Sequence, residues 1–168
     1  MMNESLMMHG MDYNGQDVSG WLMSEKLNGC RAYWDGQTMW SRGGKVIDVP
    51  AGMRAALPDF PLDGEIHAGW GGFEVARQAV QYGRWTDDCR FSAFDAPAAF
   101  GDFMERYHFM RSRLPAGGVV ERISHVVING IEDAVAWLSV IQKLGGEGVV
   151  LRDPANMYKP GRTGQILK

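Results

Sequence analysis

The residue best placed for chemistry in this sequence is Lys26, within the run Glu25-Lys26-Leu27-Asn28-Gly29-Cys30-Arg31. It follows the apolar run Trp21-Leu22-Met23, so we expect it at the end of a strand. Partial desolvation or nearby cations lower the pKa of a lysine, which makes its neutral amine available as a nucleophile. Gly29 would let the backbone turn sharply and pass close to a ligand. On this run alone, a solvated turn lysine is the simpler interpretation.

Composition indicates a single folded domain around this lysine. The chain has 168 residues, of which 45% are hydrophobic and 22% are charged, as in soluble globular proteins. It has no apolar run of transmembrane length and no secretory signal pattern, so a cytoplasmic location is expected. Cys30 and Cys89 lack metal-ligand spacing and are expected to be buried thiols rather than a disulfide.

The charge distribution is unlike that of a stand-alone nucleic-acid-binding protein, because the net charge is −3. Two local basic clusters remain. The first, Arg106, Arg111, Arg113 and Arg122, is expected to be a solvated helix face, with a DNA-backbone contact as the alternative. The second consists of Arg152, Lys159, Arg162 and Lys168. Any phosphate binding should therefore be local.

Short strands, turns and helices alternate from Val18 onward, so one domain is expected over 18–168, after a loose lead-in over 1–17. Strands are predicted at 21–26, 30–34, 38–42, 46–49, 62–67, 89–95, 119–127 and 147–152, and from 165 onward. Helices are predicted at 51–57, 73–81, 100–114 and 131–144, the last with Ile131, Val135, Leu138 and Ile141 inward. This interleaving predicts an α+β fold with two packed, antiparallel-rich β-sheets and flanking helices.

Six short motifs occur in a fixed order along this pattern. They are Glu25–Arg31, Ser41-Arg42, Leu62–Glu65, Phe91–Asp95, Glu147–Arg152, and Tyr158–Arg162 leading to Leu167-Lys168. Together they resemble the motif set of the covalent nucleotidyltransferases, whose catalytic domain is ATP-grasp-like, and specifically of ATP-dependent DNA ligases of the small bacterial and phage type. The resemblance extends from about Val18 to Lys168.

The resemblance implies a three-step reaction that serves DNA repair and replication. A lysine amine, here Lys26, attacks the α-phosphate of ATP with Mg²⁺ or Mn²⁺ to give lysyl-AMP. The AMP passes to the 5′-phosphate of a nick in duplex DNA, and the 3′-hydroxyl then displaces it. Phosphoryl-type transfer needs positioning and positive charge more than acid–base groups, and the sequence offers both.

The resemblance also implies roles for individual residues. Glu25 would lie in the ATP site, and Arg31 and Arg42 would bind phosphate, because a guanidinium matches phosphate oxygens. Glu65 would contact the ribose or a metal ion, Phe94 would stack on adenine, and Glu147 would bind the metal ion. Lys168, and Lys159 as a second candidate, would neutralise the α-phosphate, and Arg152 and Arg162 would be structural or face DNA. The structural alternatives are surface arginines and lysines, a core phenylalanine and ordinary strand-end carboxylates.

The sequence departs from the family pattern in two respects. Asn28 stands where the family usually has aspartate; asparagine keeps a carbonyl acceptor but loses the charge, which puts nick sealing in doubt. The resemblance also ends at Lys168, whereas these ligases continue into an oligonucleotide-binding (OB) barrel that clamps the duplex. An isolated catalytic domain or a naturally short protein, monomeric and with weak sealing, is expected.

Three alternative functions remain open on the sequence. An RNA ligase or a GTP-using capping enzyme would share the lysine chemistry. A non-catalytic nucleotide-binding module would keep the pocket without covalent attachment. An ordinary α+β domain with coincidental motifs is the third.

Overall fold

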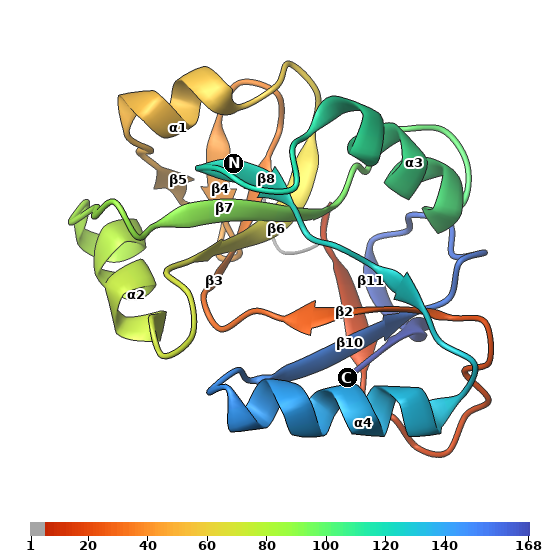
Figure 1. Ribbon diagram of the computed structural model, residues 1–168. Coiled ribbons are helices and arrows are strands. Elements are labelled where there is room, and N and C mark those ends of the chain that lie inside the picture. Colours follow the sequence, from red (N-terminus) through yellow and green to blue (C-terminus); the bar gives the residue numbers. More distant parts are fainter. Residues whose placement is uncertain (1–5) are drawn as a thin grey trace.

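The predicted α+β architecture, with two β-sheets and flanking helices, is confirmed by a computed structural model that describes residues 6–168 (Figure 1). The strand order is β1-β11-β10-β2-β9 in one sheet and β5-β4-β3-β6-β7-β8 in the other. Most neighbours are antiparallel; the β1–β11 and β7–β8 pairs are parallel.

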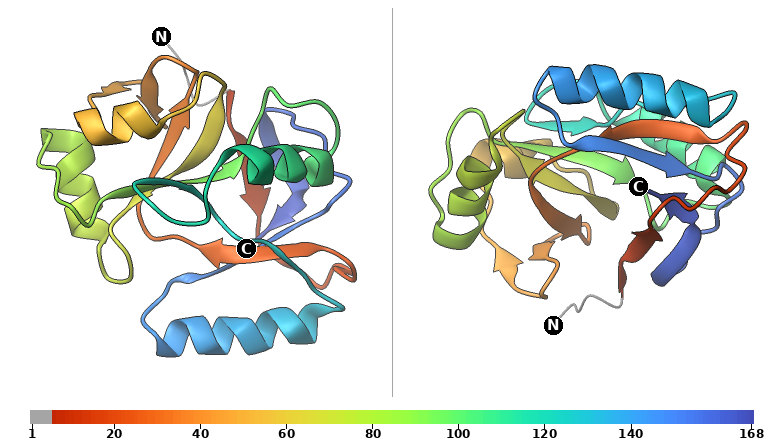
Figure 2. Two further views of the ribbon diagram at one scale, coloured as in Figure 1. Left: turned by 45° about the horizontal axis from the view of Figure 1, so that its top comes forward. Right: turned by 90° about the horizontal axis from the view of Figure 1, so that it is seen from below.

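The five-stranded sheet carries Lys26 at the end of its strand β2. Its strands are β1 (Met8–Met11), β2 (Leu22–Lys26), β9 (Val126–Val127), β10 (Gly148–Arg152) and β11 (Gly161–Leu167). Helix α4 (Ile131–Lys143) lies along the outer face of β2 and β10, as the right-hand view of Figure 2 shows. Val18, Met23, Ala134 and Leu151 are buried in the core of this layer.

The six-stranded sheet holds the larger core. Its strands are β3 (Cys30–Trp34), β4 (Met39–Ser41), β5 (Val46–Ile47), β6 (Leu62–His67), β7 (Arg90–Asp95) and β8 (Val120–Arg122). The helices beside it are α1 (Ala51–Ala56), α2 (Phe73–Tyr82) and α3 (Phe103–Arg113). Phe103 and Met110 of α3 are fully buried, as the helical spacing predicts.

Two glycines of the motifs, Gly29 and Gly64, lie so close to a neighbouring strand that a side chain would not fit. A Cβ atom on Gly29 would lie 2.1 Å from the carbonyl oxygen of Ile66, so β3 can begin against β6 only with glycine there. A Cβ atom on Gly64 would lie 2.5 Å from the carbonyl oxygen of Ser92 and 2.8 Å from the Phe91 ring. Gly29 was expected to pass close to a ligand; the close approach is instead to the neighbouring strand.

Three sequence-based expectations differ from the structure at the level of elements. Residues 8–11 of the expected lead-in form β1, where Met8 is buried against β11; residues 1–5 of that segment lie outside the described residues. The single strand expected over 119–127 is two strands in different sheets, β8 and β9. Val135 of α4 is 57% exposed, and Ala134 is buried in its place, because the inward stripe runs through residues 131, 134, 138 and 141.

Arg106 corrects a fourth expectation. It was placed with Arg111, Arg113 and Arg122 on a solvated helix face, but its side chain is fully buried and bound to Asp95. A charged residue at a helix position that faces the core needs a partner of opposite charge. Helical spacing does not reveal that Asp95, 11 residues earlier on β7, is that partner. Within residues 6–168, none of the helices has the length and apolar character needed to cross a lipid bilayer.

Candidate active site

A cavity of about 230 Å³ opens between the two sheets and contains the end of β2. It is rich in positive charge although the whole chain has a net charge of −3. Among its lining residues are six basic and two acidic side chains: Lys26, Arg31, Arg42, Arg152, Arg162 and Lys168, with Glu25 and Glu65. The walls also include Met8, Phe94, Ile123, Val150 and Ile166. An apolar enclosure with clustered cations suits a ligand that combines a flat ring with phosphates.

The amino group of Lys26 lies in an ion pair with the carboxylate of Glu147. The two residues face each other because β2 and β10 are antiparallel and Lys26 pairs with Gly148. Burial is the main cause that lowers the pKa of Lys26, and the positive charge of Lys168 lowers it further, whereas Glu65 opposes the shift. Burial and Lys168 therefore favour the neutral amine that a nucleophilic lysine requires, whereas the ion pair with Glu147 favours the ammonium.

Arg31, on strand β3 of the six-stranded sheet, is held in place by a network of hydrogen bonds. Its Nε and Nη2 atoms donate to the Asp63 carboxylate at 2.7 and 2.8 Å, and Nη2 also donates to the Met8 carbonyl oxygen at 2.8 Å. The Tyr158 hydroxyl donates to the same Asp63 carboxylate at 2.9 Å. Burial alone would lower the pKa of Arg31, but Asp63 raises it well above its ordinary value. Arg31 is therefore a fixed cation in the lining of the cavity.

Glu65 is an acidic group in a site where ionisation is unfavourable. It lies on β6 opposite Arg31 of β3. Burial raises its pKa to about 7, although Arg31 and Lys26 act in the opposite direction. A carboxyl group that titrates near neutrality can either donate or accept a hydrogen bond, which fits its predicted contact with a ribose hydroxyl.

Phe94 lines the cavity and is only partly buried, so it is not an ordinary core residue. The guanidinium of Arg31 lies 4.8 Å from its ring centroid, and that of Arg152 lies 5.7 Å away. Arg152 was predicted to be structural or to face DNA. It is 5% exposed and donates from Nη1 to Asp95, so its position is in the cavity wall and not on the outer surface.

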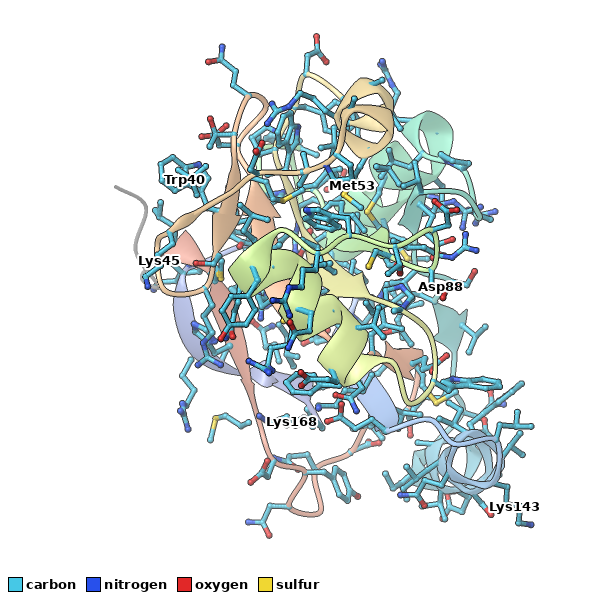
Figure 3. All side chains as sticks on the ribbon, turned by 90° about the vertical axis from the view of Figure 1, so that its left-hand side faces the viewer. Trp40, Lys45, Met53, Asp88, Lys143 and Lys168 are labelled. Atoms are coloured by element: carbon cyan, nitrogen blue, oxygen red, sulfur yellow. The ribbon has the colours of Figure 1, made fainter. Side chains whose placement is uncertain are left out.

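Three further predicted cations lie at the mouth of the cavity. Arg42 follows β4, Arg162 lies on β11, and Lys168 follows β11; all three are exposed and line the cavity. Lys168 is fixed by its backbone, which donates to the Met11 carbonyl and accepts from the Tyr13 amide. Figure 3 shows Lys168 near the lower middle of the molecule, whereas Lys143 lies apart on α4. Lys159 is exposed and is not among the cavity-lining residues.

Glu147 lies beside the main cavity and lines a second cavity of about 240 Å³. That cavity is also lined by Glu25, Leu27, Asn28, His67, Gly69 and Trp70. Within residues 6–168, no group of three or more His, Cys, Asp and Glu side chains is arranged to hold a metal ion. Mg²⁺, however, commonly binds through one or two carboxylates together with substrate phosphates. Glu65 and Glu147 fit that pattern as hard oxygen ligands.

Sequence reasoning missed several residues that shape the site. Asp63 belongs to a recognised motif, but the sequence does not show that its carboxylate binds Arg31. Nor does it show that the Tyr158 hydroxyl, 95 residues further on, donates to the same carboxylate. Met8 contributes through β1, a segment with no clear periodicity in the sequence. These residues share one property: each satisfies a buried polar group that needs a hydrogen-bond partner. Which polar groups are buried is known only once the fold is known.

The sequence and fold were compared with those of known proteins. A curated DNA ligase from Haemophilus influenzae is 32% identical over 160 residues, which cover 93% of this chain and 60% of that ligase. This chain is thus similar in sequence to a DNA ligase. It spans about 60% of the length of the curated ligase it matches, and no protein-family model matches it.

Solved ligase structures share the fold of this chain. A Lig E DNA ligase superimposes with a TM-score of 0.87 at 28% identity, over 96% of this chain and 67% of that chain. A Chlorella virus DNA ligase-adenylate gives a TM-score of 0.79 at 23% identity, over 96% and 67% of the two chains, which is a likeness of fold. The two-sheet core described above is thus the nucleotidyltransferase domain fold of ligases.

Proposed function

We propose that this chain is the catalytic domain of an ATP-dependent DNA ligase and forms lysyl-AMP at Lys26. The observation that carries the proposal is the position of Lys26. It is the last residue of β2, and it lines a cavity together with five other Lys and Arg side chains. The relatives support the same chemistry, since the curated relative is a DNA ligase and the Chlorella virus structure is a ligase-adenylate.

The first step follows from this arrangement. The neutral Lys26 amine attacks the α-phosphorus of ATP; a nitrogen–phosphorus bond forms, the bond to pyrophosphate breaks, and the nitrogen loses a proton. Arg31, Arg42, Arg162 and Lys168 would bind the phosphate oxygens, because fixed cations stabilise the charge that develops in transfer. Phe94 would stack on adenine and Glu65 would bind the ribose.

Glu65 and Glu147 would bind a divalent cation together with the nucleotide phosphates. The cation would supply positive charge that bridges phosphate oxygens. Glu147 is paired with Lys26, so it would exchange the ammonium for the cation as the amine becomes neutral.

The proposed acceptor of the AMP is the 5′-phosphate of a DNA nick, with nicked duplex as the partner. The cavity mouth carries the exposed cations Arg42 and Arg162, which suit a phosphate on the incoming strand. Asn28 is exposed at the second cavity and has no carboxylate to offer, so we expect the sealing step to be slow. We expect an added OB barrel to strengthen duplex binding.

Intact mass spectrometry tests the covalent step directly. The protein would be measured as purified, after pyrophosphate with Mg²⁺, and after ATP with Mg²⁺. Lys26→Ala is the test variant, and Lys143→Ala is the matched control, because Lys143 is exposed at the end of α4. An AMP adduct present in the control and absent in Lys26→Ala supports the proposal. Binding of ATP without any adduct would instead indicate a nucleotide-binding module, and an adduct formed with GTP would indicate another nucleotidyltransferase.

A further inference from the structure

The loop between β6 and α2, residues 68–72, reaches from one sheet to the other. Its Trp70 donates a hydrogen bond from Nε1 to Oε1 of Glu25 at 2.6 Å. Glu25 lies on β2 in the five-stranded sheet and immediately precedes Lys26. The indole therefore links the six-stranded sheet to the strand that carries the nucleophile.

The same indole packs against the turn that carries Glu147. A Cβ atom on Gly146 would lie 3.2 Å from Nε1 of Trp70, and one on Gly145 would lie 3.9 Å from the Trp70 Cβ atom. Gly145 has φ +91°, a conformation that glycine adopts without strain. In Figure 1 the β6–α2 loop descends toward the end of α4 where this turn begins. One side chain thus touches the elements on both sides of the Lys26–Glu147 pair.

The loop is itself anchored to the six-stranded sheet. The Gly69 amide donates to Nδ1 of His67 at 3.2 Å, and the Gly72 amide donates to the Gly69 carbonyl at 3.1 Å. Because Nδ1 accepts a hydrogen bond, the ring proton is assigned to Nε2, which donates to the Ser92 hydroxyl at 2.7 Å. Ser92 in turn donates to Glu121 at 2.6 Å. A buried chain through β6, β7 and β8 therefore fixes the base of the loop.

We propose that Trp70 is a positioning residue that reaches from the six-stranded sheet to the five-stranded sheet and aligns Lys26 with Glu147, by binding Glu25 and covering the Gly145-Gly146 turn. The inference rests on the proposed function only for its kinetic consequence. Trp70 lines the second cavity and is not among the residues that line the nucleotide cavity. Its loss should therefore slow lysyl-AMP formation at saturating ATP and leave the ATP concentration for half-maximal rate unchanged.

The kinetic test is a double-mutant cycle on the rate of lysyl-AMP formation. Trp70→Phe keeps an aromatic ring but removes the N–H donor, and we expect the maximal rate to fall about 10-fold. In a Glu25→Ala background, Trp70→Phe should change the rate by less than about 2-fold, because the bond is already lost. Glu25→Gln keeps an acceptor oxygen, so in this background Trp70→Phe should still lower the rate. An equal effect of Trp70→Phe in both backgrounds, or an effect on half-saturation alone, overturns the proposal.

A second readout does not depend on activity. Hydrogen exchange of peptides over 22–29 and 144–150 should be faster in Trp70→Phe than in the wild type. Trp137→Phe is the control, because Trp137 is exposed to a similar degree on α4, 50% against 53%, and its indole donates no hydrogen bond to the described residues. Unchanged exchange in Trp70→Phe overturns the positioning role even if no lysyl-AMP forms. Absence of the adduct from the wild type, with exchange altered as expected, would count against the proposed function alone.

Discussion

Arg106 and Asp95 form a doubly hydrogen-bonded ion pair in the interior of the protein, with neither side chain exposed. The Nε–Oδ1 distance is 2.8 Å and the Nη2–Oδ2 distance is 3.1 Å. Arg152 of the other sheet donates to the same carboxylate. Asp95 therefore joins helix α3, strand β7 and strand β10 behind the nucleotide cavity. One carboxylate neutralises only one of the two arginines, so the wall of the cavity keeps positive character.

Asp95→Ala should be strongly destabilising, since it leaves two buried guanidinium groups without a counter-charge. We expect the free energy of unfolding to fall by about 3–5 kcal/mol in urea denaturation. Arg106→Met, which keeps the pair of Asp95 with Arg152, should cost less. Asp88→Asn, at an exposed aspartate labelled in Figure 3, is the control and should leave stability unchanged. A wild-type-like midpoint for Asp95→Ala would contradict this account.

Gly64→Ala and Gly52→Ala should have opposite effects on stability. The added methyl group at Gly64 meets the Ser92 carbonyl and the Phe91 ring, which are both fixed by β7, so a loss of about 1–3 kcal/mol is expected. Gly52 lies in α1 with open space around it, and alanine there should stabilise by about 0.5–1 kcal/mol. Thermal and urea unfolding of the two variants measure the difference. Similar effects at the two positions would show that close approach to β7 is not what requires Gly64.

The raised pKa of Glu65 predicts a specific dependence of stability on pH. The folded state binds the proton more tightly than the unfolded state, with a pKa of about 7 against 4.5. The contribution of protonated Glu65 is therefore complete below about pH 4.5 and is lost as the pH rises through about 7. Glu65→Gln mimics the protonated form, so its stability relative to the wild type should increase between pH 5 and pH 8 by about 1–3 kcal/mol.

Urea denaturation at pH 5 and pH 8 measures this change. Glu132→Gln, at an exposed carboxylate in the first turn of α4, is the control. A constant difference between Glu65→Gln and the wild type at the two pH values would refute the raised pKa.

Phe94 should contribute to ATP affinity through its ring. Phe94→Ala removes the surface on which adenine is proposed to stack, and the dissociation constant for ATP should rise about 10-fold or more. Phe94→Trp keeps a flat aromatic face and should retain most of the affinity. Calorimetric titration with ATP measures both, and Phe100→Ala, at a phenylalanine that is 92% exposed outside the cavity, is the control. A normal affinity for Phe94→Ala would place adenine elsewhere.

The parts of the fold that follow local rules could be predicted from the sequence. Strands β3 and β6 match the expected residues, and the hairpin at Asp35-Gly36 is present because Asp35 accepts from the amides that follow it. Helices have clear periodicity, although α3 begins three residues later than expected, at a capping box formed by Asp102 and Glu105. These features depend on neighbours within a few residues, which the sequence shows directly.

The parts that depend on distant partners could not be predicted. β1 is a strand because β11 offers it an edge about 150 residues later, and its own sequence carries little signal. Arg106 can be buried because the Asp95 carboxylate and the Asn156 carbonyl oxygen accept hydrogen bonds from its guanidinium. Most of the predicted site residues line one cavity, since six ordered motifs constrain one another. Of the predicted residues, Lys159 and Glu147 do not line that cavity, and Glu147 lines the second one. Trp70 could not be predicted because no motif marks it.

The pairing of β1 with β11 has a consequence for synthesis of the protein. Residues 8–11 are synthesised long before their partner strand, which ends at Leu167, and the backbones of Met11 and Tyr13 are bound by Lys168. A growing polypeptide can form the six-stranded sheet from residues 30–122 before the nucleotide cavity can close. The nascent chain should therefore remain unable to hold ATP until β11 has been translated.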